Sequence, residues 1–173
     1  MKKIDPNLLA IAFTEHDLCT RCGTCAGACP VGAITLDENF FPVLDADACT
    51  ECGLCARVCP GGMVNFLDLT ELTFGHRNPA TRFDGHVEAT YVGYAGDKQL
   101  RRGGAGGGVI TALMWDLLQR GLVDGCIVTR IKPQQPWLGE VLIARSREEL
   151  RASQQSKYII IPVNEILAAV RDT

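Results

Sequence analysis

The chain has 173 residues, of which 47% are hydrophobic and 21% charged, a balance that supports a packed core and excludes disorder throughout. The formal net charge of −3 argues against a nucleic-acid-binding protein, because such proteins present a basic face. Nine cysteines are many for this length, and eight of them fall in two runs.

The first 18 residues predict a polar lead-in and no targeting segment. Met1-Lys2-Lys3 is not followed by the apolar run of a signal peptide. Every apolar stretch of the chain is shorter than the about 20 residues that a membrane-spanning helix needs. We therefore expect no membrane span and a cytoplasmic location, where clustered cysteines hold metal more often than they form disulfides.

Residues 19–66 contain an internal repeat. Its two copies, CTRCGTCAGACP and CTECGLCARVCP, start 30 residues apart at Cys19 and Cys49 and share the pattern C-x-x-C-x-x-C-x-x-x-C-P. Between them, residues 33–36 and 41–44 predict two short strands around a turn at residues 37–39. The double run is the bacterial ferredoxin pattern, which holds two [4Fe–4S] clusters.

The spacing within each run predicts how the cysteines are shared between the clusters. Three cysteines at intervals of three reach three irons of one cubane, while the fourth, before proline, serves the other cubane. Gly23 and Gly53 leave room for each loop to pass close to the cluster. The crossed assignment gives one cluster Cys19, Cys22, Cys25 and Cys59, and the other Cys49, Cys52, Cys55 and Cys29.

Zinc and disulfides are the alternatives for these eight cysteines. Zinc sites usually present paired C-x-x-C ligands, four to a metal, and two complete runs ending in Cys-Pro favour iron–sulfur clusters. The ninth cysteine, Cys126, lies in an apolar stretch and is predicted to be an inert core residue.

Residues 67–87 predict a connector, because Gly75, Asn78-Pro79 and Asp84-Gly85 interrupt regular structure. From residue 88 onward the pattern changes. Apolar stretches predict strands at 89–95, 125–131, 138–144 and 158–163.

Helices are predicted between these strands. Apolar residues at helical spacing from Val109 to Leu118 predict a helix that Gly121 ends. Ser146 begins a capping box that opens a short helix, and Asn164 is a predicted N-cap for a helix over residues 165–170. The succession of strand, helix and strand predicts a partly parallel sheet.

A glycine-rich string, RRGGAGGGVITAL, occupies residues 101–113. It matches neither the dinucleotide-binding spacing G-x-G-x-x-G nor a P-loop. It still places a glycine loop before a helix N-terminus, with Lys98, Arg101 and Arg102 just upstream, and such a terminus favours a phosphate group. The alternative is that the glycines only allow a helix and a strand to pack closely.

The segments YVGYAGDKQLRRGGAGGGVITALMWDLLQRGLVDGCIVT and SQQSKYIIIPVNEIL resemble the N-terminal half of the coenzyme F-420 hydrogenase/dehydrogenase beta-subunit family. With the cysteine runs, the resemblance covers residues 15–170. It implies an FAD that exchanges electrons with the clusters. The implied fold class is α+β, with a bacterial two-cluster ferredoxin-like module followed by an incomplete α/β flavin-binding domain.

The resemblance also implies which residues contact the flavin nucleotide. A cation there favours the anionic reduced flavin, which suits Lys157, although an ordinary surface lysine is the alternative. No catalytic residue is assigned. The residues expected to bind the cofactor are Arg101, Gly106, Gly107, Gly108, Thr111, Ser156, Lys157 and Tyr158.

This interpretation divides the chain into a ferredoxin-type domain at 1–66, a linker at 67–87 and part of an FAD-binding domain at 88–173. Members of the resembled family continue beyond the position where this sequence stops, so we expect other redox subunits as partners, including one that completes the flavin domain. The expected function is that of an oxidoreductase subunit, passing electrons between two clusters and an FAD that serves coenzyme F-420 or a similar two-electron acceptor. The alternatives are a ferredoxin-like subunit without its own flavin, docking to a larger redox complex, and a non-catalytic fragment.

Overall fold

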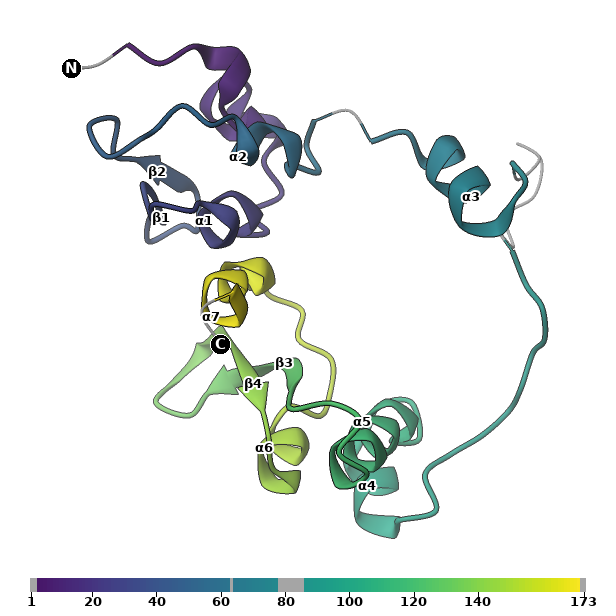
Figure 1. The fold of residues 1–173 in the computed structure, drawn as a ribbon. Coiled ribbons are helices and arrows are strands. Elements are labelled where there is room, and N and C mark those ends of the chain that lie inside the picture. Colours follow the sequence, from purple (N-terminus) through teal and green to yellow (C-terminus); the bar gives the residue numbers. More distant parts are fainter. Residues whose placement is uncertain (1–2, 63, 78–85, 172–173) are drawn as a thin grey trace. The chain divides into compact units, whose positions relative to one another are not determined.

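The structure is a computed structural model that describes residues 3–62, 64–77 and 86–171 (Figure 1). It mixes helices with two small sheets, in agreement with an α+β chain. Its contacts define two units, one formed by Met1–Gly62 together with Tyr94–Thr173 and the other by Met63–Gly93. The described part of the chain has no helix that is both long and apolar enough to cross a membrane.

The cysteine-rich part of the first unit is built from short elements. The strands β1 (Ile34–Leu36) and β2 (Pro42–Leu44) pair antiparallel, which confirms the predicted hairpin. Its turn is held by the Asp37 carboxylate, which accepts the N–H groups of Asn39 and Phe41, both at 2.8 Å. The helical elements are η1 (Pro6–Leu8), η2 (Ile11–Phe13), η3 (His16–Leu18), α1 (Thr24–Ala28) and α2 (Leu54–Arg57).

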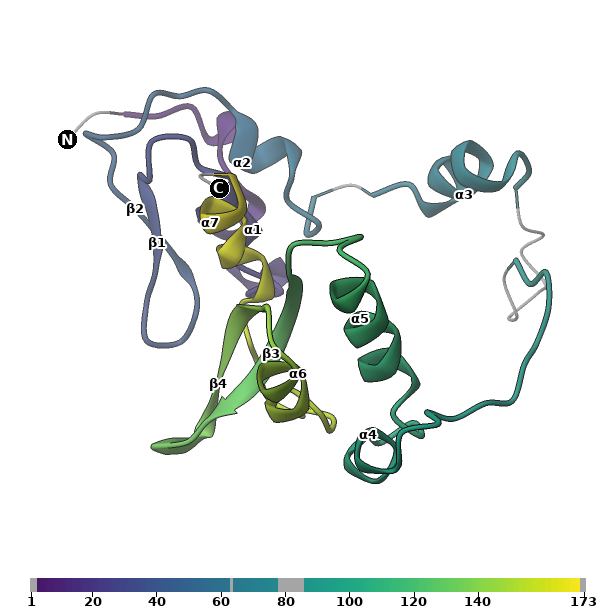
Figure 2. The same cartoon turned by 60° about the horizontal axis from the view of Figure 1, so that its bottom comes forward.

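The second half of this unit is built around an antiparallel hairpin of two longer strands (Figures 1 and 2). The strands β3 (Cys126–Lys132) and β4 (Gln135–Ala144) pair so that Cys126 lies opposite Ala144. The predicted strands at 125–131 and 138–144 are thereby confirmed. The helices around the hairpin are α4 (Lys98–Gly103), α5 (Val109–Gln119), α6 (Arg147–Ala152), η4 (Val163–Ile166) and α7 (Leu167–Arg171).

The core of this half forms where α5 and α6 pack against the hairpin. Leu150 of α6 and Ala144 of β4 are completely buried, and Trp115 of α5 packs against them. Cys126 lies in the same core, as predicted. The α5 helix ends as expected, since Gly121 adopts a φ of +62° just beyond its last turn.

Two of the predicted strands are wrong. Residues 89–95 are extended but unpaired over most of their length, and Val92 is fully exposed. Residues 158–163 cannot continue a ladder because Pro162 has no N–H, and the Val163 N–H instead bonds to the carbonyl of Ile161 at 2.8 Å. The predicted partly parallel sheet is therefore also wrong, since both sheets of the described chain are antiparallel.

The helices differ from the prediction at three further points. The predicted connector contains α3 (Phe66–Phe74), which Asn65 caps at its start and Gly75 at its end. The α4 helix was not expected, and the Asp97 carboxylate caps it by accepting the Gln99 N–H at 2.8 Å. Asn164 is not an N-cap, because η4 already begins at Val163.

The predicted capping box of α6 is confirmed, and it supports a stability prediction. The hydroxyl of Ser146 accepts the Glu149 N–H at 3.2 Å, and the Glu149 carboxylate accepts the Ser146 N–H at 3.0 Å. We expect Ser146→Ala to lower the free energy of unfolding by about 1 kcal/mol, measured by urea titration. Ser156→Ala is the control, since Ser156 is exposed and lies outside the helix; an equal loss in both variants would contradict this role of the box.

Candidate functional site

Two cavities in the cysteine-rich part are each bordered by four cysteines. In each, three cysteines come from one run and the fourth from the other, and none of the eight is in a disulfide. These are the same two groups as in the crossed assignment, while ligation itself stays a prediction. The first cysteine set is Cys19, Cys22, Cys25 and Cys59, and the second cysteine set is Cys29, Cys49, Cys52 and Cys55.

The donor set fits a polynuclear cluster. In a [4Fe–4S] cluster each thiolate binds a different iron, so its four ligands surround a volume and do not converge on a point. Among the side chains that the structure describes, no three of His, Cys, Asp or Glu converge as they would around one metal ion. The cysteines instead line the walls of the two cavities.

The two cysteine loops have the same backbone geometry. Arg21 and Glu51 occupy equivalent positions and both adopt a left-handed conformation, with φ of +55° and +57°. This conformation is uncommon for such residues. It lets the Arg21 N–H approach the sulfur of Cys19 and the Glu51 N–H approach that of Cys49, both at 3.4 Å. N–H groups placed in this way can donate to the sulfurs of a bound cluster.

The thiols within these sets differ in acidity. The pKa of Cys25 is raised to about 11, mainly by burial; the Ala26 N–H lowers it, and the nearby thiols of Cys22, Cys59 and Cys19 raise it. Burial also raises the pKa of Cys55. At Cys22, burial acts in the same direction, but hydrogen bonds led by those of Thr24 outweigh it and lower the pKa.

Different segments cover the two loops. A Cβ on Gly53 would meet the side chain of Leu8 at 3.2 Å, and the thiol of Cys55 donates to the Leu8 carbonyl at 3.4 Å. A Cβ on Gly23 would meet the Glu165 backbone nitrogen at 2.9 Å. The loop of the second cysteine set therefore packs against η1, and the loop of the first cysteine set packs against η4.

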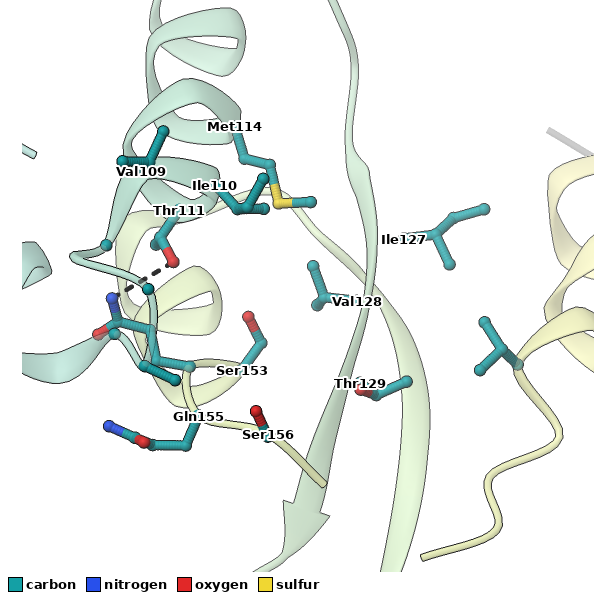
Figure 3. Close-up of a pocket in the computed structure, with 16 residues that line it drawn as sticks. Val109, Ile110, Thr111, Met114, Ile127, Val128, Thr129, Ser153, Gln155 and Ser156 are labelled. Atoms are coloured by element: carbon teal, nitrogen blue, oxygen red, sulfur yellow. Dashed lines mark hydrogen bonds between the residues drawn. The ribbon is translucent and has the colours of Figure 1, made fainter. Parts of the chain in front are cut away.

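A third cavity, of about 370 Å³, lies at the start of α5 (Figure 3). Its size is that of a small-molecule pocket, which typically measures about 300–1,000 Å³. Gly108 is the N-cap residue of α5 and offers no side-chain cap, so N–H groups of the first turn lack intrahelical partners. The lining comes from the glycine loop, the start of α5, the middle of β3, residues 153–156 and Val163, and none of the described lining residues is charged.

Four of the eight residues predicted to bind the flavin line this third cavity: Gly106, Gly108, Thr111 and Ser156. Gly107 is not among the described lining residues; its φ is +64° and its carbonyl accepts the Ala95 N–H at 2.9 Å.

The other three lie elsewhere. The guanidinium of Arg101 lies 3.6 Å from the ring centroid of Tyr94, and Tyr158 is 93% exposed. Lys157 is not an ordinary surface lysine, because its ammonium group donates to the carbonyls of Ser153, Gln154 and Gln155. Burial lowers the pKa of Lys157.

Gln154 is a lining residue that the sequence did not indicate. Its amide donates to the Leu100 carbonyl at 2.9 Å and to the hydroxyl of Thr111 at 3.3 Å. It thereby connects the end of α6 to both α4 and α5. No sequence pattern marks Gln154, because both partners are more than 40 residues away along the chain.

The glycines of the string have different roles. A Cβ on Gly104 would lie 2.6 Å from the Cα of Gly108, and a Cβ on Gly108 would overlap the backbone of Leu100. These two glycines allow the loop to pack against α4, so close packing explains part of the string. A Cβ on Gly106 would meet no described atom within 4 Å, although Gly106 lines the third cavity.

The comparisons with protein families cover both halves of the chain. Residues 90–168 match the family described as coenzyme F420 hydrogenase/dehydrogenase, beta subunit N-term. Residues 18–63 match the 4Fe-4S dicluster domain. These matches confirm the resemblance inferred from the cysteine runs and the glycine string.

Among curated relatives, the coenzyme F420-dependent sulfite reductase of Methanocaldococcus jannaschii is 31% identical over 157 residues, 91% of this chain and 22% of that protein. An F(420)H(2) dehydrogenase subunit of Methanosarcina mazei is 25% identical over 170 residues, 91% of this chain and 42% of that protein. The chain thus spans less than half the length of either relative. In the F420-reducing [NiFe] hydrogenase complex from Methanosarcina barkeri, one chain superposes with a TM-score of 0.40 at 28% identity, covering 47% of this chain and 30% of that one.

Proposed function

We propose that this chain passes electrons between two [4Fe–4S] clusters and an FAD. Its residues 90–168 match the F420 hydrogenase/dehydrogenase beta-subunit family, and its residues 18–63 match the 4Fe-4S dicluster domain. The FAD serves coenzyme F420 or a similar two-electron acceptor. The observation that carries the proposal is the grouping of eight cysteines around two cavities, three from one run and one from the other.

In this proposal the first cysteine set and the second cysteine set each hold one cluster by their thiolates. The N–H groups of Arg21 and Glu51 lie at 3.4 Å from ligand sulfurs and offset negative charge there. A [4Fe–4S] cluster supplies one-electron exchange when it is bound. The residues 1–66 then form the ferredoxin-type domain, followed by the linker 67–87 and the flavin-binding part at 88–173.

The third cavity is the proposed flavin site. The start of α5 presents N–H groups beside Gly106 and Gly108, a setting that favours a phosphate group. Thr111 and Ser156 add hydroxyls to the same lining. Arg101, Gly107, Lys157 and Tyr158 belong to the segments that flank this lining and stay in the proposed set. FAD supplies the conversion between two-electron and one-electron transfer when it is bound.

We propose other redox subunits as partners. The matched family is described as a beta subunit, and the relative from Methanosarcina mazei is itself named as a subunit of a dehydrogenase. The described lining of the third cavity has no charged side chain, so a cation for the reduced flavin has to come from outside it. A partner that completes the flavin domain can supply that cation.

Gly106→Val tests the flavin site. Gly106 has no positive φ and a Cβ there would meet open space, so the substitution leaves the fold unstrained. Gly106 lines the third cavity, so a larger residue at this position tests ligand binding there. We expect the variant to bind at least tenfold less flavin than the parent, measured as fluorescence released on denaturation, with the cluster absorbance unchanged. Reduced coenzyme F420 should bleach the clusters of the FAD-loaded parent but not those of the variant.

Gly96→Val is the matched control, because Gly96 is also open and lies outside the lining. Equal flavin content in all three proteins would rule out the glycine loop as the flavin site. Bound flavin without cluster bleaching would rule out coenzyme F420 as the electron source.

One observation favours the alternative of a ferredoxin-like subunit without its own flavin. The two cations expected near the flavin are engaged elsewhere, Arg101 over the Tyr94 ring and Lys157 on three carbonyls. In that case the reconstituted chain would hold both clusters and no flavin, and it would exchange electrons with a docked flavoprotein only.

A further inference from the structure

The two cysteine runs differ at four of their twelve positions, and two of these differences coincide with a contact. Thr24 and Gly27 of the first run correspond to Leu54 and Arg57 of the second. A Cβ on Gly27 would overlap the carbonyl oxygen of Asn164, so a residue as large as arginine could not stand there. Only the first of these two runs is therefore built to accept η4.

Asn164 of η4 binds this run at two points. Its N–H donates to the carbonyl of Cys22 at 2.9 Å, and its side-chain amide donates to the hydroxyl of Thr24 at 2.7 Å. The Thr24 hydroxyl lies 3.1 Å from the sulfur of Cys22. A cluster-bound Cys22 would be a thiolate without a proton, so the Thr24 hydroxyl would then be the donor of this bond. A chain of hydrogen bonds thus runs from Asn164 through Thr24 to Cys22.

The second run differs at the position that corresponds to Thr24. Leu54 takes the place of Thr24 and has no hydroxyl to donate. Cys52, which occupies in the second run the position of Cys22 in the first, is exposed, whereas Cys22 is half-buried. The two sets of thiolates therefore offer different surroundings to an added electron.

A hydrogen bond to a ligand sulfur stabilises the reduced form of an iron–sulfur cluster, because reduction places more negative charge on the sulfurs. We propose that Asn164 and Thr24 are positioning residues that raise the reduction potential at the first cysteine set above that at the second cysteine set. This inference rests on the proposed function, since it requires a cluster at each set.

Asn164 also lies next to the proposed flavin site, which relates the difference in reduction potential to electron transfer with the flavin. Val163, its neighbour in the chain, lines the third cavity. If the two bound clusters received one electron between them, it would reside on the cluster of higher potential. The Asn164–Thr24 pair would make that the cluster at the first cysteine set. That set is joined through Asn164 to the proposed flavin site.

The test is a redox titration of the reconstituted chain, followed by electron paramagnetic resonance. The parent should show two midpoint potentials. Thr24→Val keeps the side-chain shape and removes the hydroxyl, so it should lower the higher midpoint and leave the other in place. Asn164→Ala should lower the same midpoint, and adding it to Thr24→Val should cause little further change, because both act through one hydrogen bond. Leu54→Thr should raise the lower midpoint.

Thr35→Val is the matched control, because Thr35 is an exposed residue of β1 and lies outside both cysteine loops. It should move neither midpoint. Unchanged midpoints in Thr24→Val, or a shift of the lower midpoint alone, would overturn the inference. The proposed function would still stand in that case, provided that the parent holds two clusters. A parent without clusters would overturn both.

Discussion

Adding Cys59→Ala to a Cys19→Ala/Cys22→Ala double variant is expected to leave its iron content unchanged, whereas adding Cys29→Ala is expected to destroy the remaining cluster. The parent should hold about eight irons per chain and the double variant about four, because each [4Fe–4S] cluster contributes four. Cys59 borders the cavity that the double variant has already disabled, and Cys29 borders the intact one.

Ligation within each run would give the reverse result, with Cys59→Ala removing the remaining iron. Cys126→Ala is the control, since Cys126 lies in the core beside Met114 and away from both cavities, and it should keep about eight irons. Elemental analysis of the same samples also decides between iron and zinc. Zinc in place of iron would refute both cluster assignments.

Gly108→Ala is expected to destabilise the chain by about 2–4 kcal/mol, from a left-handed φ and from overpacking. Gly108 has a φ of +71°, and its new Cβ would overlap the backbone of Leu100 in α4. The loop would have to move away from α4, and α5 would lose its N-cap geometry. Urea unfolding followed by the fluorescence of Trp115, which packs against the core, measures the effect.

Gly106→Ala is the matched control, because it has neither a positive φ nor a described neighbour within 4 Å of the new Cβ. It should change the free energy of unfolding by less than about 0.5 kcal/mol. Equal midpoints for the two variants would mean that the loop tolerates a side chain at Gly108. The difference between the two glycines also explains why Gly106 is the better position for testing flavin binding.

The sequence predicted best those features that depend on residues close together in the chain. The hairpin β1–β2 and the capping box at Ser146 each form within about ten residues, and local chemistry decides them. The grouping of the cysteines followed from the repeat itself, whose two loops share their backbone conformation at Gly23 and Gly53.

The incorrect strands show where this reasoning fails. An apolar run becomes a strand only when a partner pairs with it, and the sequence does not say whether residues 89–95 or 158–163 have one. In residues 158–163, Pro162 has no N–H to donate to a neighbouring strand. Side-chain contacts between neighbouring segments escape the sequence in a similar way: Lys157 donates to three carbonyls of its own turn, and Arg101 lies over the ring of Tyr94.

The contact of Asn164 with Thr24 joins residues that are 140 positions apart in the sequence. Contacts of such separation form late in folding, because the entropy of closing a long loop is lost before the contact contributes any stabilising free energy. The cysteine loops and the hairpin β3–β4 depend on much shorter separations and are free to form first. During synthesis, the first run is therefore complete long before η4 leaves the ribosome. A cluster inserted early at this run would have surroundings like those of the second run, and its redox properties would change when the chain finishes folding.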